Sequence, residues 1–308
     1  MTGGLIGAVD IGGTKIAVGV VHPDGILLSS EQAPTLPEQG FESAMQRIAD
    51  MLKHCADGRP LVGVGVGCTG PVDPLLGVMG NMELLPGWEG SNLSLYLEKL
   101  TGLLTVLEND ADAAALAEAA WGAGRGAERF IYVTLSTGIG VGLVFDGRLY
   151  RGVGGAHPEI GPHVIQADGP LCPCGVRGCW ESLASGTALA ALLPPLSAEQ
   201  ICQQAEAGDS QALAAVGQVA RFMGIGLANL INLYTPDVIA LGGGLMKSRP
   251  LFWPAIQQTI RQQCRLVPYE QTRLLPAKLG GQVGLAGAAA AWLNRQQPPV
   301  EDDELLYP

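Results

Sequence analysis

Three cysteines in one short segment have the spacing of a metal site. Residues 172–181 read CPCGVRGCWE, which places thiols at Cys172, Cys174 and Cys179, and the glycines allow the loop to fold back on itself. Tetrahedral zinc favours thiolate ligands and needs one further ligand. The alternative is a disulfide with one spare thiol, but a C-x-C pair is too short to bridge comfortably. The segment therefore predicts zinc, and Glu181 directly after the loop would be held in place by it.

A glycine turn near the start of the chain has the features of a phosphate-binding loop. Residues 6–9 are apolar, DIGGTK follows at 10–15, and residues 16–21 are apolar again, which predicts a strand, a turn and a second strand. Glycines let backbone amides approach a phosphate, and a carboxylate at the turn can hold Mg²⁺ through water. An ordinary β-hairpin is the alternative. The predicted phosphate and Mg²⁺ contacts are Asp10, Gly12, Gly13, Thr14 and Lys15.

The same pattern recurs at residues 134–147, which read TLSTGIGVGLVFDG. In this alignment Thr137 corresponds to Thr14. Gly142 likewise corresponds to Gly19. Two glycine hairpins in one chain indicate duplicated halves, each with a loop that faces a phosphate.

The composition fits a compact two-domain α/β protein. The 308 residues are 47% hydrophobic and 15% charged, and a chain of this length can bury two cores. Lysine and arginine number 18 against 29 aspartates and glutamates, and this net charge of −11 argues against nucleic acids and anionic membranes as main partners. The uncharged stretch 222–236 is too short and too polar to span a bilayer. Seven cysteines, without a signal-peptide pattern, predict a reducing, cytoplasmic location.

Strand and helix patterns occur in two similar sets, which predict a duplicated βββαβα fold. The first set has a helix over 41–55 and strands over 61–66 and 103–107, and the second has strands over 130–135, 141–145 and 238–241 with helices within 184–207 and over 211–233. Ligands collect at the carboxyl ends of strands in open α/β sheets, so we expect them in the cleft between the two domains. The predicted domains are 1–112 with a returning helix 285–295, 113–284, and a disordered tail over 296–308.

These motifs together resemble the ROK family (repressors, open reading frames and kinases). The resemblance covers nearly the whole chain and rests on motifs in the family's order, which are DIGGTK at 10–15, the turn at 67–73, PGW at 86–88, END at 108–110, LSTGIG at 135–140, EIG at 159–161 and the cysteine loop. It implies two actin-like (ribonuclease H-like) domains, as in hexokinase-type ATPases, that bind a sugar and ATP with Mg²⁺. Family repressors resemble this chain preceded by a helix-turn-helix domain, and its absence favours a kinase.

The resemblance also implies roles for single residues. Asp110 would be the general base, because a carboxylate can orient a sugar hydroxyl and accept its proton as the phosphoryl bond forms. The alternative is that Asn109 or Asp110 only caps the next helix. The implied sugar contacts are Gly70, Asn109, Asp110, Glu159 and Glu181, although surface solvation would also account for the two glutamates. The implied nucleotide contacts are Thr137 and Gly138 in the second phosphate loop and Gly242, Gly243 and Gly244 in an adenosine loop.

Two positions depart from the family's pattern. The family usually has asparagine at the position of Asp112, so this chain has an added charge near the base. The family usually has its fourth zinc ligand, a histidine, where this chain has Pro162, which cannot ligate. Either His163 shifts to complete the site, or water is the fourth ligand, or zinc is lost. A second histidine, His157, lies two residues before Glu159.

The sequence therefore predicts an ATP-dependent sugar kinase that acts on glucose at its 6-hydroxyl. Relatives with the same motifs act on N-acetylmannosamine, N-acetylglucosamine or fructose, and some use polyphosphate as the donor. A sugar sensor that has lost turnover and a DNA-binding repressor are the non-enzymatic alternatives. The family resemblance also implies a homodimer joined mainly through the C-terminal domain.

Overall fold

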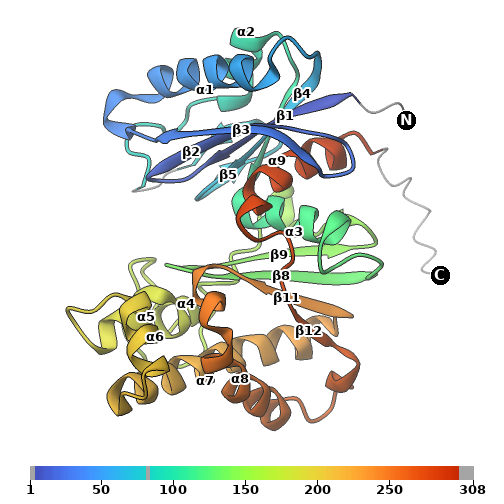
Figure 1. Ribbon diagram of the computed structural model, residues 1–308. Coiled ribbons are helices and arrows are strands. Elements are labelled where there is room, and N and C mark those ends of the chain that lie inside the picture. Colours follow the sequence, from blue (N-terminus) through green and yellow to red (C-terminus); the bar gives the residue numbers. More distant parts are fainter. Residues whose placement is uncertain (1–3, 81–83, 298–308) are drawn as a thin grey trace, which may run out of the picture. The chain divides into compact units, whose positions relative to one another are not determined.

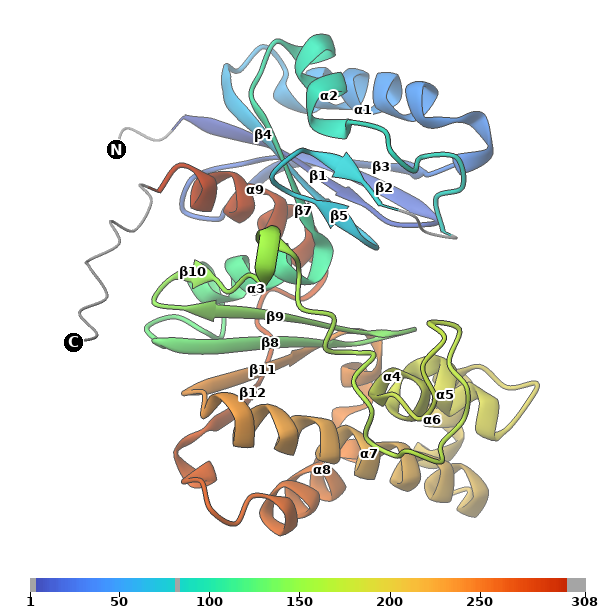
Figure 2. The same cartoon turned by 180° about the vertical axis from the view of Figure 1, so that it is seen from behind.

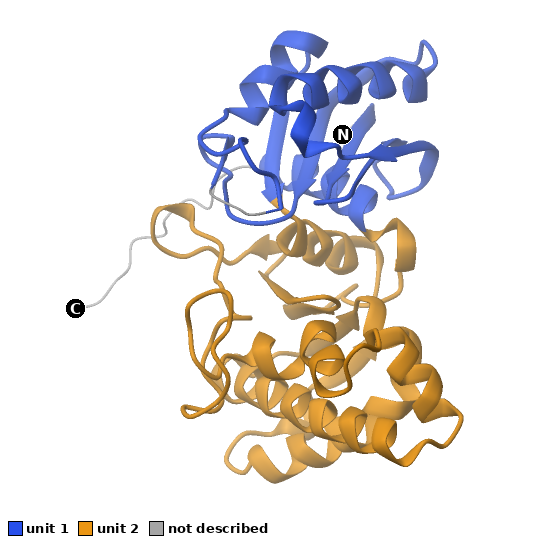
Figure 3. Cartoon of the chain, turned by 90° about the vertical axis from the view of Figure 1, so that its left-hand side faces the viewer, with its two compact units in different colours: residues 1–108, 284–308 blue, residues 109–283 orange. Residues whose placement is uncertain are grey.

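The computed structural model describes residues 4–80 and 84–297, and the chain divides into two compact units (Figure 3). Unit 1 comprises Met1–Glu108 and Gly284–Pro308, and unit 2 comprises Asn109–Val283. The first division lies four residues before the predicted boundary at 112. Most of the predicted disordered tail, 298–308, lies outside the described residues.

Unit 1 is built on a five-stranded mixed sheet in the order β3-β2-β1-β4-β7 (Figure 1). β1 pairs antiparallel with β2 and parallel with β4. Helix α1 buries an apolar stripe against the sheet, as its helical spacing predicts. The elements are β1 (Leu5–Ile11), β2 (Lys15–Val21), β3 (Leu27–Pro34), η1 (Pro37–Gln39), α1 (Phe41–Ala56), β4 (Leu61–Cys68), β5 (Val72–Asp73), β6 (Val78–Met79), α2 (Leu93–Thr101), β7 (Thr105–Asn109) and α9 (Val283–Arg295).

Unit 2 repeats this arrangement, because its five-stranded sheet has the order β10-β9-β8-β11-β12. The repeated strand order confirms the predicted α/β duplication. The elements are α3 (Asp110–Trp121), β8 (Arg129–Leu135), β9 (Ile139–Phe145), β10 (Arg148–Leu149), η2 (Val153–Gly155), α4 (Trp180–Ala184), α5 (Gly186–Leu192), α6 (Ala198–Glu206), α7 (Ser210–Tyr234), β11 (Val238–Gly242), η3 (Gly244–Ser248), α8 (Arg249–Gln263), η4 (Tyr269–Gln271), β12 (Arg273–Pro276) and η5 (Gly280–Gln282).

The helix that follows the last strand of each sheet belongs to the other unit. α3 follows β7 but lies in unit 2, and α9 follows β12 but lies in unit 1 from its second residue onward. In unit 2, a Cβ at Gly142 would lie 2.5 Å from the Cβ of Ala115 on α3. In unit 1, a Cβ at Gly19 would lie 3.1 Å from Leu285 on α9. Gly19 and Gly142, which correspond in the alignment of the two hairpins, thus lie beneath α9 and α3 respectively. A larger residue at either position would clash with the helix above it.

Helix α7 is long and apolar enough to cross a membrane by length and composition. It packs against α4, α6 and α8 within unit 2 (Figure 2), and Val216, Met223 and Leu227 are among its buried residues. Its apolar character is that of a core helix.

Glu118 joins α3 to the segment after β12 inside unit 2. The side chain is buried; its Oε1 accepts from the amides of Lys278 and Leu279 at 2.8 Å each, and Oε2 accepts from the amide of Ala123 at 2.7 Å. These bonds satisfy three backbone amides in the interior.

We expect Glu118→Ala to lower the free energy of unfolding by about 3–5 kcal/mol, because three buried amides lose their acceptor. Glu118→Gln keeps the shape and the Oε1 bonds, so it should cost only about 1–2 kcal/mol. Urea unfolding of both variants measures the difference. Equal losses for the two substitutions would show that side-chain volume, and not the acceptor oxygens, stabilises this region.

Candidate active site

The predicted general base lies at the first residue of a capped helix in unit 2. Asn109 caps α3, since its Oδ1 accepts from the amides of Ala111 at 2.9 Å and Asp112 at 3.3 Å. The side chain of Asp110 beside it is exposed. Capping is therefore the role of Asn109, and it does not account for Asp110. A sugar contact by Asn109 would have to come from its amide nitrogen, because its oxygen is committed to the helix.

The structure brings Glu181 to the second predicted phosphate loop. The turn between β8 and β9 carries Thr137, which is exposed, and Gly138. The Oε2 atom of Glu181 accepts from the amide of Ile139 at 2.8 Å. A Cβ at Gly138 would lie 2.4 Å from the same oxygen, so only glycine allows this approach. A predicted sugar contact and a predicted phosphate contact are thus neighbours.

A cavity of about 570 Å³ opens beside this turn, within the usual size range of small-molecule sites. Two of the predicted nucleotide contacts, Thr137 and Gly244, line the cavity. The full lining consists of Ser136, Thr137, Gly186, Thr187, Ala190, Ser197, Ala198, Glu199, Cys202, Gln203, Glu206, Gly244, Leu245, Lys247 and Ser248.

The three glycines after β11 differ in their surroundings. Gly243 has a φ of +88°, and a Cβ there would lie 2.3 Å from the carbonyl oxygen of Leu135. A Cβ at Gly242 would lie 2.5 Å from the Tyr132 hydroxyl oxygen. Gly244 borders the cavity instead. The first two glycines therefore serve packing against β8, and the third leaves room in the cavity wall.

Sequence reasoning missed the helical wall of this cavity, which α6 provides. Glu199, Cys202 and Glu206 recur at intervals of three and four residues, so they share one helix face, and this spacing was the available signal. Burial raises the pKa of Cys202, which keeps its thiol protonated. Lys247 and Ser248 of η3 complete that side.

The first predicted phosphate loop is the turn between β1 and β2 in unit 1. The Gly12 amide donates to the Lys15 carbonyl at 2.9 Å, and the Thr35 hydroxyl donates to the Gly12 carbonyl at 2.7 Å. The two strands and this turn form a hairpin, in which the side chains of Thr14 and Lys15 are exposed. Gly70, a predicted sugar contact, follows β4 with a φ of +83°, a value that favours glycine.

The side chain of Asp10 is partly buried and lies beside the start of α9. A Cβ at Gly284 would lie 2.1 Å from the Asp10 Oδ2 atom, so the carboxylate approaches the helix backbone closely. Burial raises the pKa of Asp10, and the charge of Lys15 opposes part of that rise. A phosphate or Mg²⁺ site that uses this carboxylate therefore requires ionisation against a desolvation penalty.

We expect Asp10→Asn to raise the free energy of unfolding of the ligand-free protein at pH 7–8 by about 0.5–1 kcal/mol. A raised folded-state pKa contributes stability at low pH that is lost as the pH rises through it, and asparagine avoids that loss. The difference from the wild type should fade as the pH falls below the unfolded-state pKa of about 3.9 and be absent near pH 3, where the carboxyl group is protonated in both states. Thermal unfolding across this pH range tests it; a less stable variant at neutral pH would mean that the N-terminus of α9 outweighs desolvation.

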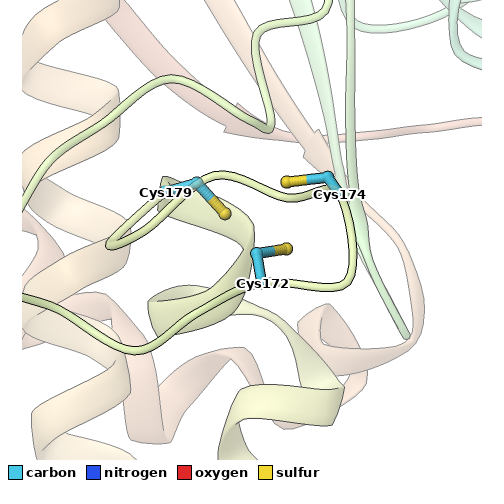
Figure 4. A group of neighbouring side chains, drawn as sticks. All are labelled: Cys172, Cys174 and Cys179. Carbon is cyan, nitrogen blue, oxygen red and sulfur yellow. The ribbon is translucent and has the colours of Figure 1, made fainter.

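The cysteine loop brings three sulfur atoms together (Figure 4). The Sγ atoms of Cys172, Cys174 and Cys179 all lie within 4.8 Å of one another, and only Cys174 is exposed. Burial raises the pKa of Cys172 to about 12. Burial also acts to raise the pKa of Cys179, but hydrogen bonds from Ser182 and the neighbouring thiols outweigh it and lower that pKa. Three converging soft donors fit zinc.

The structure does not bring His163 to these sulfurs. Its Nδ1 lies 2.5 Å from the carbonyl oxygen of Ile160, its Nε2 lies 3.2 Å from the Asn229 amide nitrogen, and its ring packs against Trp180. Within the described ranges, the metal-ligating group contains the three thiols without a histidine. This differs from the prediction of His163 as the fourth ligand, since the ring would first have to leave both partners.

Main-chain hydrogen bonds fasten the cysteine loop to the segment that carries Glu159. The amide of Glu181 donates to the Gly161 carbonyl at 3.0 Å, and the amide of Trp180 donates to the His163 carbonyl at 2.8 Å. Glu159 itself is exposed, two residues before Gly161. The three sulfurs and both glutamates thus belong to one connected piece of unit 2.

Two sheets of identical strand order, each with a glycine hairpin between its first two strands, define an actin-like fold of the hexokinase type. The chain belongs to the ROK family, whose model matches residues 6–295.

Relatives with an assigned role include enzymes and regulators. The glucokinase of Thermotoga maritima is 32% identical over 305 residues, which cover 93% of this chain and 96% of that protein. The xylose repressor of Bacillus subtilis is 30% identical over 290 residues, which cover 89% of this chain and 75% of the repressor.

Solved structures agree with the fold over most of the chain. The ROK hexokinase of Thermus thermophilus has a TM-score of 0.85 at 38% identity and covers 94% of this chain and 99% of that chain. A ROK family glucokinase from Streptomyces griseus, in complex with glucose and AMPPNP, has a TM-score of 0.78 at 34% identity and covers 96% of this chain and 100% of that chain.

Proposed function

We propose that this protein transfers the γ-phosphate of ATP to a hexose, with the 6-hydroxyl of glucose as the acceptor. The observation that carries the proposal is the exposed Asp110 on a helix that Asn109 caps, in the same unit as a phosphate turn with a nucleotide-sized cavity. The glucokinase of Thermotoga maritima and the glucose complex of the Streptomyces griseus enzyme support the choice of substrate.

Asp110 would accept the proton of the attacking hydroxyl, since a sugar hydroxyl alone is a poor nucleophile. Glu159 and Glu181 would accept hydrogen bonds from other sugar hydroxyls, with Asn109 and Gly70 as further contacts. Fixing the hydroxyl in line with the γ-phosphorus supplies much of the rate, because phosphoryl transfer depends mainly on positioning and charge stabilisation.

The nucleotide would occupy the cavity beside Thr137 and Gly244, with Gly138, Gly242 and Gly243 shaping its walls. The turn from Gly12 to Lys15 would contact phosphate oxygens. Mg²⁺, when bound, would neutralise developing charge on the phosphates, and Asp10 would hold it through water.

Zinc would be structural, held by Cys172, Cys174 and Cys179 with one further ligand. Its effect would be to keep the loops of Glu159 and Glu181 in a fixed geometry before the sugar arrives. A homodimer and a cytoplasmic location complete the proposal.

A coupled assay with MgATP and a panel of glucose, N-acetylmannosamine, N-acetylglucosamine and fructose tests the function directly. We expect the highest kcat/KM for glucose, and a parallel reaction with polyphosphate compares the two donors. The xylose repressor is nearly as similar as the glucokinases, so a measured rate is needed. Glucose binding by calorimetry without turnover on any sugar would overturn the kinase and support a sensor.

A further inference from the structure

A buried charged cluster lies between the helix of the proposed base and the loop of a proposed sugar contact. Asp112 is 0% exposed, and its Oδ2 atom lies 2.8 Å from His157 Nδ1 and 3.5 Å from Arg151 Nη1. Both contacts have ion-pair distances without hydrogen-bond alignment, and Oδ1 of Asp112 has no hydrogen-bond partner among the described residues. The added charge noted in the sequence is therefore buried and faces two basic side chains of one loop.

The loop in question runs from β10 to Glu159 and contains η2. Gly152 donates to the Ala156 carbonyl at 2.8 Å, so this bond shapes the loop from within. Val153 at its tip is 96% exposed. Arg151 and His157 flank that tip, and both are directed to Asp112 on α3. The acidic side chain therefore fastens both ends of a glycine-rich loop to the helix.

The positions along the chain connect this cluster to the proposed chemistry. Asp112 follows Asp110 by two residues on the same helix, and His157 precedes Glu159 by two residues. Residues two apart on a helix point in different directions, so Asp112 can face the interior while Asp110 is exposed. A buried carboxylate is expensive in free energy even when paired, so an apolar residue would serve packing alone at least as well.

We propose that Asp112, His157 and Arg151 form a positioning cluster that holds Glu159 in a fixed place relative to Asp110 and thereby sets hexose affinity. This inference rests on the proposed kinase function and deepens it. The three residues act through Glu159, not on the sugar, so their effect falls on hexose binding more than on the nucleotide.

Asp112→Asn and His157→Gln, alone and combined, test the proposal, with Asp146→Asn as the matched control. Asp146 lies exposed in the turn between β9 and β10, where asparagine tolerates its φ of +51°. We expect each single variant to raise the KM for glucose about tenfold or more, while the KM for MgATP changes less than about twofold. The glucose KM of the double variant should be no higher than that of the more affected single variant, because both substitutions break the same contact between Asp112 and His157. The control should match the wild type.

Hydrogen exchange of residues 151–160 gives a readout that does not depend on catalysis. We expect faster exchange of these amides in Asp112→Asn and His157→Gln, and unchanged exchange in the control. Absence of turnover in the wild type would overturn the kinase, while the exchange result would still decide the positioning role. Unchanged glucose KM in a folded variant, equal changes in both KM values, or unchanged exchange would overturn the cluster. If Asp112→Asn fails to fold, Arg151→Lys, which keeps the charge, should retain a glucose KM near that of the wild type, and a large rise would count against the charge contact.

Discussion

Asp110→Asn is expected to lower kcat for hexose phosphorylation by about 10²- to 10⁴-fold, the usual loss when a positioned base is removed. Glucose affinity should change by less than about threefold, because asparagine has the same size and still offers an oxygen to the sugar hydroxyl. Steady-state kinetics with MgATP measure the rate, and calorimetry measures glucose binding. A folded variant with wild-type turnover would contradict the assignment of the base.

The capping geometry of α3 separates an effect of this substitution on catalysis from an effect on folding. Asn109 caps α3 by accepting from the amides of Ala111 and Asp112, so the substitution should leave this cap intact. Replacing a carboxylate in the first turn of a helix costs only about 0.3–1 kcal/mol through the helix dipole. Asp146→Asn is the matched control for loss of one negative charge in unit 2. A large fall in stability of Asp110→Asn would mean that its kinetic loss reports folding and not chemistry.

Cys174→Ala should reduce bound zinc from one ion per chain to a small fraction and raise the glucose KM by about tenfold or more. The KM for MgATP should change much less, because the cavity is built from other loops. Cys174 is exposed, so without a metal this substitution would be an ordinary surface change with an effect within about 0.5 kcal/mol. Metal analysis of the purified, reduced protein decides the point. A content of less than half a zinc ion per wild-type chain would contradict the proposed zinc site.

Two further variants define the ligand set. Cys264→Ala removes a buried thiol whose partner is the carbonyl of Ala228, and it should keep its zinc. His163→Ala should also keep its zinc, because both ring nitrogens of His163 have other partners. Loss of zinc in His163→Ala would show that the ring turns to the sulfurs when the ion binds, as the sequence predicted.

The fold was largely predictable from local patterns. The alignment of Gly19 with Gly142 indicated the duplication, and both residues lie beneath equivalent helices. The apolar runs located β1, β4, β8 and β11, because buried strands in mixed sheets are nearly continuous in apolar residues. The third strand that the predicted βββαβα pattern requires, β3, was not located, because its residues alternate between partly buried and exposed and half of its sequence LLSSEQAP is polar.

The site was predictable where glycine or cysteine spacing carries the signal, and less so where distant elements meet. The three sulfurs converge as their spacing indicates. The wall that α6 adds to the cavity depends on tertiary packing, which no local motif encodes. Arg151 and His157, which face the Asp112 carboxylate, are 39 and 45 residues further along the chain. The sequence therefore indicated the added charge of Asp112 but not the basic side chains beside it.

The exchange of α3 and α9 between the units has a consequence for synthesis on the ribosome. A Cβ at Gly63 would lie 2.0 Å from Trp292 Nε1, and one at Gly65 would lie 1.8 Å from the Ala288 carbonyl oxygen, so α9 rests directly on β4. Unit 1 lacks this helix until residues 284–295 emerge, about 10–35 s after residue 108 at ordinary elongation rates. Unit 2 is continuous in sequence and can complete its core first. The part of the protein that is made first is therefore the part that finishes folding last, and a nascent chain stalled before residue 284 would present an uncovered glycine-lined strand to chaperones.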